Sequence, residues 1–214
     1  VQCGTAIVTE QLLDEQQALK FESLCVDAGA RFIGGVMAAL GFAERELTGT
    51  DTYYGITPSD AREEADMFTT GWFTGLVPIT APVDGTFAAA AVAAQESFDR
   101  GRQLVNVPFY RVLELVPQLS WPRPYHPMIN FFDGGAPPLS QLFTNPLLVS
   151  NPIGLYAESK SVYQLTIFIS RFPTETTLMI AYPDNPVARE SITRYVDLVK
   201  STFARVCEQN DVVP

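Results

Sequence analysis

The end of the chain combines two patterns that require two packed layers of secondary structure. Apolar residues occupy alternate positions between Ser161 and Arg171, which predicts a strand that is buried on one face. A helix follows, with Asn185 as its N-cap and Pro186 as its first residue. The apolar stripe of this helix consists of Ile192, Tyr195, Val196, Val199, Phe203 and Val206. A strand and a helix that are each apolar on one face bury those faces by packing against each other. The fold class is therefore expected to be α+β.

The preceding residues alternate between helical and strand patterns. Helices are predicted at about Glu10–Ala28, Arg31–Leu47 and Thr86–Leu104, with a short one that has Pro108 as its first residue. Strands are predicted at Tyr53–Thr57, Gly71–Val83, Met128–Phe132, Leu147–Ser150 and Thr176–Tyr182, the last in a hairpin with the strand at 161–171. Pro78 and Pro82 favour an edge position for one strand, and Gly34-Gly35 predict close packing of their helix on the sheet. Together these elements predict a two-layer sandwich in which helices cover a mixed sheet.

Composition limits the size of this domain and its partners. The chain has 214 residues, enough for one domain with its own core. Its formal net charge of −10 repels nucleic acid backbones and anionic lipid headgroups, so neither is expected as a main partner. No apolar run approaches the roughly 20 residues that a membrane-spanning helix needs.

Reactive groups are scarce. The single histidine, His126, lies in a proline-rich loop, so a mechanism that needs two histidines within this chain is excluded. The sequence contains no GxSxG, GxGxxG or GxxxxGK[ST] motif. The three cysteines form no CxxC pair, and Cys25 and Cys207 are expected to be small buried hydrophobes. We therefore expect no catalytic residue, metal site or cofactor in this chain, which is either a binding domain or one part of a longer enzyme. The start without methionine favours the second reading.

Four segments resemble, in order, the motifs of condensation-type acyltransferases. GWFTGLVPIT at 71–80 resembles a G-x-F-x-N-x-L-P core motif, with Thr74 and Gly75 in its middle, so the usual asparagine is missing. VNVPFYRVLE at 105–114 and HPMINFFDGG at 126–135 resemble the segments that follow it. The stretch at 182–195 resembles the closing motif. Together with ELTGTDTYYGITPSDAR at 46–62, the sequences of these motifs are most similar to those of mycobacterial polyketide-associated acyltransferases, especially those that acylate trehalose or sulfated trehalose.

The resemblance implies one lobe of a two-lobed enzyme. Such proteins are pseudo-dimers of lobes that are each like a chloramphenicol acetyltransferase subunit, and the N-terminal lobe holds the catalytic motif His-His-x-x-x-Asp-Gly. Because this sequence lacks the motif, residues 1–214 resemble the C-terminal lobe, inactive without its absent N-terminal partner. The implied reaction transfers a long fatty or polyketide acyl chain from an acyl-CoA or carrier-protein thioester to a hydroxyl of trehalose or sulfated trehalose. The implied products are glycolipids, among them sulfolipids, of the mycobacterial cell envelope.

The resemblance also implies that this lobe forms one wall of a substrate tunnel. The candidate tunnel residues are Trp72, Phe73, Thr74, Asn130, Phe131, Phe132 and Asp133, although the aromatic ones also suit a core and the polar ones a local backbone contact. An apolar lobe interface is expected, with self-association through it. The expected location is cytoplasmic, with attachment to the inner face of the plasma membrane left open. A condensation domain of peptide synthesis and a non-catalytic interaction module of the same fold remain alternatives.

Overall fold

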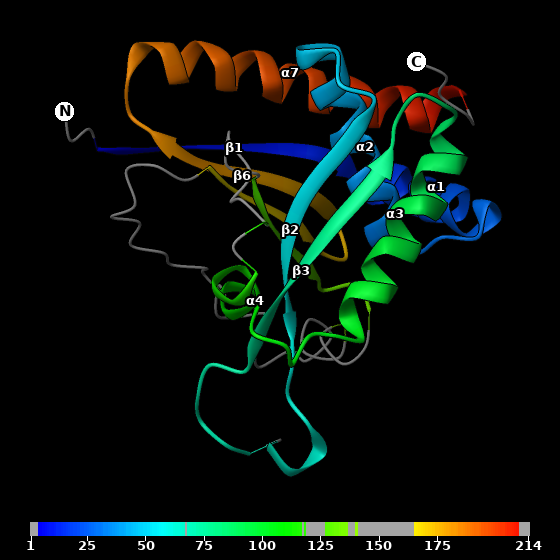
Figure 1. Ribbon diagram of the computed structural model, residues 1–214. Helices are drawn as coiled ribbons and strands as arrows, with labels where there is room; N and C mark the ends of the chain where they lie inside the picture. The colour runs from blue at the N-terminus through cyan, green and yellow to red at the C-terminus, as the bar shows by residue number, and fades with distance from the viewer. Residues whose placement is uncertain are drawn as a thin grey trace, which may run out of the picture.

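A single six-stranded sheet runs through the computed structural model, which describes residues 4–66, 68–116, 118, 127–136, 140 and 165–209. Its strands are β1 (Thr5–Asp14), β2 (Thr52–Asp60), β3 (Thr74–Pro82), β4 (Met128–Asp133), β5 (Thr166–Arg171) and β6 (Glu175–Pro183). They lie in the order β1-β6-β5-β4-β2-β3 (Figure 1). β4 is parallel to β2 and to β5, whereas the other pairs are antiparallel. The mixed sheet expected from the sequence is therefore confirmed.

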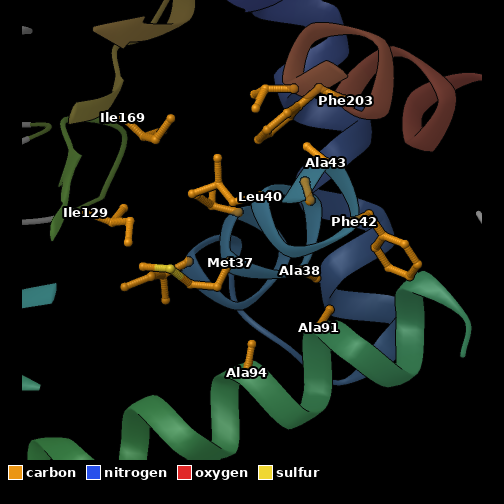
Figure 2. Packing of buried hydrophobic residues seen from close by; sticks show 14 of the residues in the cluster. Met37, Ala38, Leu40, Phe42, Ala43, Ala91, Ala94, Ile129, Ile169 and Phe203 are labelled. Carbon is orange, nitrogen blue, oxygen red and sulfur yellow. The ribbon is translucent and has the colours of Figure 1, made fainter. Parts of the chain in front are cut away.

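Four helices cover one face of this sheet. They are α1 (Glu15–Ala28), α2 (Phe32–Thr48), α3 (Phe87–Arg102) and α7 (Pro186–Gln209). Figure 2 shows Met37 and Leu40 of α2 on the side of Ile129 and Ile169, which are fully buried residues of β4 and β5. The short helix α4 (Phe109–Leu115) has no buried residue and lies apart from them (Figure 1). The predicted α+β sandwich of sheet and helices is confirmed.

Helix α2 is the centre of the core, because all its residues from Phe32 to Ala43 are buried. The two glycines of this helix allow other helices to approach it. A Cβ on Gly34 would lie 2.7 Å from the carbonyl oxygen of Ala91 in α3, and a Cβ on Gly35 would overlap the Sγ of Cys25 in α1. The expectation that these glycines pack on the sheet was wrong, since both serve contacts between helices.

The first predicted helix begins too early, because residues 10–14 belong to β1. This strand pairs with β6 along its whole length, and a bulge between Gln11 and Leu13 lets Leu12 and Leu13 both be buried. Asp14 then ends the strand and caps α1: its Oδ1 accepts the N–H of Gln17 at 2.8 Å, and its own N–H donates to Oε1 of Gln17 at 3.0 Å. The capping pair Asp14 and Gln17 sets the true start of α1, which the apolar pattern alone did not predict.

The remaining predictions have mixed outcomes. Asn185 caps α7 through a 2.9 Å bond from the N–H of Ala188, the predicted stripe of α7 faces the core, and β3 is an edge strand as its prolines indicated. Pro108 is the N-cap of α4 rather than its first residue. Cys25 and Cys207 are buried, and burial raises the pKa of Cys25 to about 12. The strand predicted at Leu147–Ser150 lies outside the described residues.

No single helix in the described ranges is long and apolar enough to cross a membrane. The pair α1 and α2 meets that criterion only together, by length and composition, across a bend of 98°.

Candidate substrate groove

The face of the sheet away from the four helices holds a groove of about 880 Å³. Strand alternation builds its floor: Ile129 of β4 points toward the helices, so its neighbours Met128 and Asn130 point the other way. The full lining is Pro58, Ser59, Asp60, Trp72, Thr74, Gly75, Leu76, Pro108, Phe109, Tyr110, Met128, Asn130 and Phe132. Three stretches of chain therefore meet here: the β2–β3 hairpin, the start of α4 and the strand β4.

Few polar side chains interrupt this apolar lining. Asn130 donates its Nδ2 to the carbonyl oxygen of Ile167 in β5 at 3.3 Å, so part of this side chain serves the backbone, as the sequence left open. Thr74, the first residue of β3, lines the groove and pairs with Asp60 of β2. Asp60 in turn accepts the N–H of Arg62 at 3.1 Å. Such a lining suits a largely apolar ligand with one polar end.

The β2–β3 connection contributes Trp72 to the groove and carries a second exposed aromatic residue, Phe68. Trp72 is 88% exposed and lines the groove, and Phe68 is 99% exposed. Phe73 does not line the groove, because its ring lies under the guanidinium of Arg62, 4.3 Å from the Arg62 Cζ. Arg62 also donates to the carbonyl oxygens of Asp66 at 2.7 Å and Thr69 at 2.6 Å. The connection thus has a local structure of its own around Arg62.

Two of the predicted tunnel residues lie elsewhere. Phe131 and Asp133 line a second hollow of about 360 Å³, between β2, β4 and the helices α2 and α3. Phe131 stacks on Phe32 of α2 with ring centroids 6.0 Å apart. Residues 58–60 border both hollows and separate them. The structure therefore brings together Trp72, Thr74, Asn130 and Phe132, and it sets Phe73, Phe131 and Asp133 apart from them.

Asp133 belongs to a charge cluster beneath the second hollow. Arg171 of β5 donates to both carboxylate oxygens of Glu22, at 3.1 and 2.6 Å, and lies 3.7 Å from Oδ2 of Asp133. Its guanidinium also lies over the ring of Phe32 at 4.4 Å. Burial raises the pKa of Asp133, and the nearby Arg171 opposes that shift. The cluster ties the end of β4 to α1 and α2.

Within the described ranges, the groove contains no obvious reactive group. His126 lies outside the described residues. Among the described residues, no three His, Cys, Asp or Glu side chains lie close enough together to hold a metal ion. Sequence reasoning missed Met128 and Leu76, although strand alternation could have placed them beside Asn130 and Thr74. It also missed Pro108, Phe109 and Tyr110, because nothing local to α4 indicates which part of the sheet it approaches.

Comparison with known proteins places this groove in context. No protein-family model matches the chain. The chain is 54% identical to acyltransferase PapA3 of Mycobacterium tuberculosis over 204 residues, which cover 94% of the chain and 43% of that protein. It is 44% identical over 207 residues to trehalose-2-sulfate acyltransferase PapA2 of Mycobacterium bovis, again over 94% of the chain and 43% of the relative. The chain is a homologue of the mycobacterial PapA acyltransferases. It spans well under half the length of these curated relatives.

Solved structures agree with the sequence relationship. A structure of PapA2 acyl transferase superposes with a TM-score of 0.86 at 42% identity, over 97% of the chain and 46% of that structure. The condensation domain of the Monacolin K polyketide synthase MokA superposes with a TM-score of 0.73 at 17% identity, over 96% of the chain and 48% of that domain. The second likeness shows the shared fold alone. The resemblance drawn from the sequence motifs is thus confirmed for the PapA relatives and for the condensation-domain fold.

Proposed function

We propose that this chain is the C-terminal lobe of an acyltransferase that moves a long acyl chain from a thioester to a hydroxyl of trehalose or sulfated trehalose. The observation that carries the proposal is the groove of about 880 Å³ on the sheet face that the four helices leave uncovered. Burial of an alkyl chain contributes about 0.8 kcal/mol for each methylene removed from water, so a mostly apolar groove suits it. Homology to a protein named trehalose-2-sulfate acyltransferase supports the class of acceptor.

In this proposal the chain binds and orients the acyl group but does not activate the acceptor. Deprotonation of a sugar hydroxyl needs a general base, and the described residues contain no histidine. The base would come from the His-His-x-x-x-Asp-Gly motif of an N-terminal lobe that this sequence does not include. Thr74 and Asn130, beside Ser59 and Asp60, are the polar side chains proposed to contact the ester end of the acyl chain.

The N-terminal lobe is the partner proposed for the open face, which is the face of the sheet that holds the groove. Two exposed apolar side chains, Trp72 and Tyr110, line the groove, and others lie in the β2–β3 connection and in or next to α4, namely Phe68, Leu104, Val107, Leu115 and Val116. A surface of this kind is typical of an interface. Without its partner lobe, the chain is expected to self-associate through the same surface, so sedimentation at rising concentration should reveal dimers. The cytoplasmic location stays a prediction.

The test is an acyl-transfer assay with a long-chain acyl-CoA and either trehalose or its 2-sulfate. The chain alone is compared with a full-length protein that contains it, and with the full-length protein in which the second histidine of the catalytic motif is replaced by alanine. We expect turnover only in the unmodified full-length protein, because the general base and the acyl groove would lie on different lobes.

Other outcomes would point to other functions. Turnover by the chain alone would contradict the half-enzyme proposal and direct attention to His126. Transfer to an amine but not to the sugar would favour the condensation alternative. No transfer by a folded full-length protein with several donors would favour the interaction module.

A further inference from the structure

The chain passes around the edge of the sheet at Gly75. Helix α3 packs on the helix-covered side of β3, and α4 borders the groove on the other side. Residues 103–108 join the two helices, and Figure 1 shows this connection passing β3 on its way to α4. Since β3 is the edge strand, the connection can reach the groove side only by crossing beside this strand.

Gly75 is the point of closest approach at this crossing. A Cβ on Gly75 would overlap the carbonyl oxygen of Val105, and it would lie 2.7 Å from Cγ2 and 2.9 Å from the carbonyl carbon of the same residue. Two of these three atoms belong to the backbone, so rotation of a side chain cannot relieve the overlap. Any residue other than glycine at this position therefore requires the backbone at Val105 to lie farther from β3.

Hydrogen bonds run through the connection between the two helices. The N–H of Val105 donates to the carbonyl oxygen of Arg102 at 3.2 Å, and the N–H of Val107 donates to that of Leu104 at 2.8 Å. Pro108 follows directly and accepts the N–H of Val112 within the first turn of α4 at 3.1 Å. A shift at Val105 is thereby passed on to the start of α4.

The start of α4 is one wall of the groove. Pro108, Phe109 and Tyr110 line it on this side, and Met128 and Phe132 of β4 belong to its floor. The distance between the start of α4 and this floor limits the thickness of the ligand that fits there. We propose that Gly75 is a specificity-determining residue, which keeps α4 close to β3 and so restricts the groove to slender acyl chains. The identity of the ligand rests on the proposed function, whereas the position of α4 does not.

The test compares the binding of two probes, palmitoyl-CoA and a methyl-branched acyl-CoA of the same chain length. The variants are Gly75→Ala and Gly75→Asn, with Gly85→Ala as the matched control, because a Cβ on Gly85 meets nothing within 4 Å. One added methyl group in an apolar pocket changes affinity by about tenfold or more. We therefore expect the preference for the straight chain to fall by about tenfold in Gly75→Ala, further in Gly75→Asn, and not at all in the control.

An unchanged preference in folded Gly75→Ala would overturn the proposal. If both Gly75 variants fail to fold, Tyr110→Ala replaces them, because this half-exposed side chain lines the same wall and its removal widens the groove without touching the core. The same fall in preference would then support the proposal, and no change would overturn it.

A crystal structure of Gly75→Ala separates the geometry from the ligand. We expect the Val105 backbone and the first turn of α4 to lie farther from β3 than in the unmodified chain, and unchanged positions would overturn the proposal. Suppose that the Val105 backbone and α4 move in the variant, but the unmodified chain binds neither probe. The role of Gly75 in placing α4 is then supported, and the proposal that the groove binds an acyl chain is contradicted.

Discussion

The two faces of the sheet are built from the same strands but have different surroundings. On β4, Ile129 is fully buried against the helices, whereas its neighbours Met128 and Asn130 border the groove. On β3, Val77 is likewise fully buried while Leu76 borders the groove. Four helices close one face, and among the described helices only the short α4, with no buried residue, borders the groove on the other. The buried core and the proposed ligand groove thus lie on opposite faces of the sheet, and adjacent residues of one strand contribute to different faces.

The largest effect is expected on the closed face. Phe203→Ala removes a fully buried ring that stacks on Phe21 with centroids 5.1 Å apart. Such a truncation leaves a cavity and should lower the free energy of unfolding by about 3–5 kcal/mol. Urea denaturation measures it. A loss below about 1 kcal/mol would mean that the closed face does not carry the stability of the chain.

The Arg171 cluster should give the next largest effect. Arg171→Gln leaves the carboxylates of Glu22 and Asp133 without their cation, and we expect a loss of about 2–4 kcal/mol because the Arg171 side chain is only 10% exposed. Arg111→Gln is the control, since its pair with Glu114 is exposed and should contribute at most about 0.5 kcal/mol. Equal losses in both variants would show that burial of the cluster adds nothing.

Glu44 is an exception to the apolar character of the closed face, and its effect should depend on pH. Burial raises its pKa to about 6, from an ordinary value of 4.5, so the folded state holds the proton more tightly than the unfolded state does. Stability should therefore fall as the pH rises from about 4.5 to 6, by about 1–2 kcal/mol when partial solvent screening is allowed for.

The variant Glu44→Gln should abolish that fall and be the more stable form at pH 7. Denaturant titrations at several pH values measure the fall, with Glu190→Gln at an exposed position of α7 as the control. A Glu44→Gln chain that keeps the full pH dependence would refute the assignment to this carboxyl.

The smallest effect on stability is expected at the rim of the groove. Trp72→Ala removes a side chain that is 88% exposed, so the free energy of unfolding should change by less than about 0.5 kcal/mol. The same variant should bind palmitoyl-CoA roughly tenfold more weakly, because apolar contact area is lost. The two values come from denaturation and from fluorescence titration. A destabilised variant with normal binding would reverse the assignment of the two faces.

The sequence predicts the closed face much better than the groove. The stripe of α7 and its cap at Asn185 follow from local rules, and both are found in the structure. The start of α1 was misplaced, because apolar residues at 12 and 13 suit either a helix or a bulged strand, and only pairing with β6 decides between them. Local pattern is sufficient where an element is stabilised by a single continuous face.

The groove depends on contacts that no local pattern contains. Adjacent positions on β4 were grouped as one wall, but the side chains of Phe131 and Phe132 lie on opposite faces of the sheet. Strict alternation would have separated them. The wall formed by Tyr110 could not be predicted, because it depends on the crossing beside Gly75, and a close backbone approach leaves no trace in the sequence except the glycine itself.

The most direct test of whether the acyl chain lies in the groove is photo-crosslinking. The probe is a palmitoyl-CoA analogue that carries a diazirine near the end of its acyl chain. Labelling is expected at three places that border the groove, namely residues 74–76, residues 108–110, and Met128, Asn130 and Phe132 of β4, and unlabelled palmitoyl-CoA should compete with it. Mass spectrometry identifies the labelled residues and thereby shows which of the two hollows the probe occupied. Competed labelling at Phe98 and Phe131, which border the second hollow, with none at Leu76 or Tyr110, would contradict the assignment of the acyl chain to the open face.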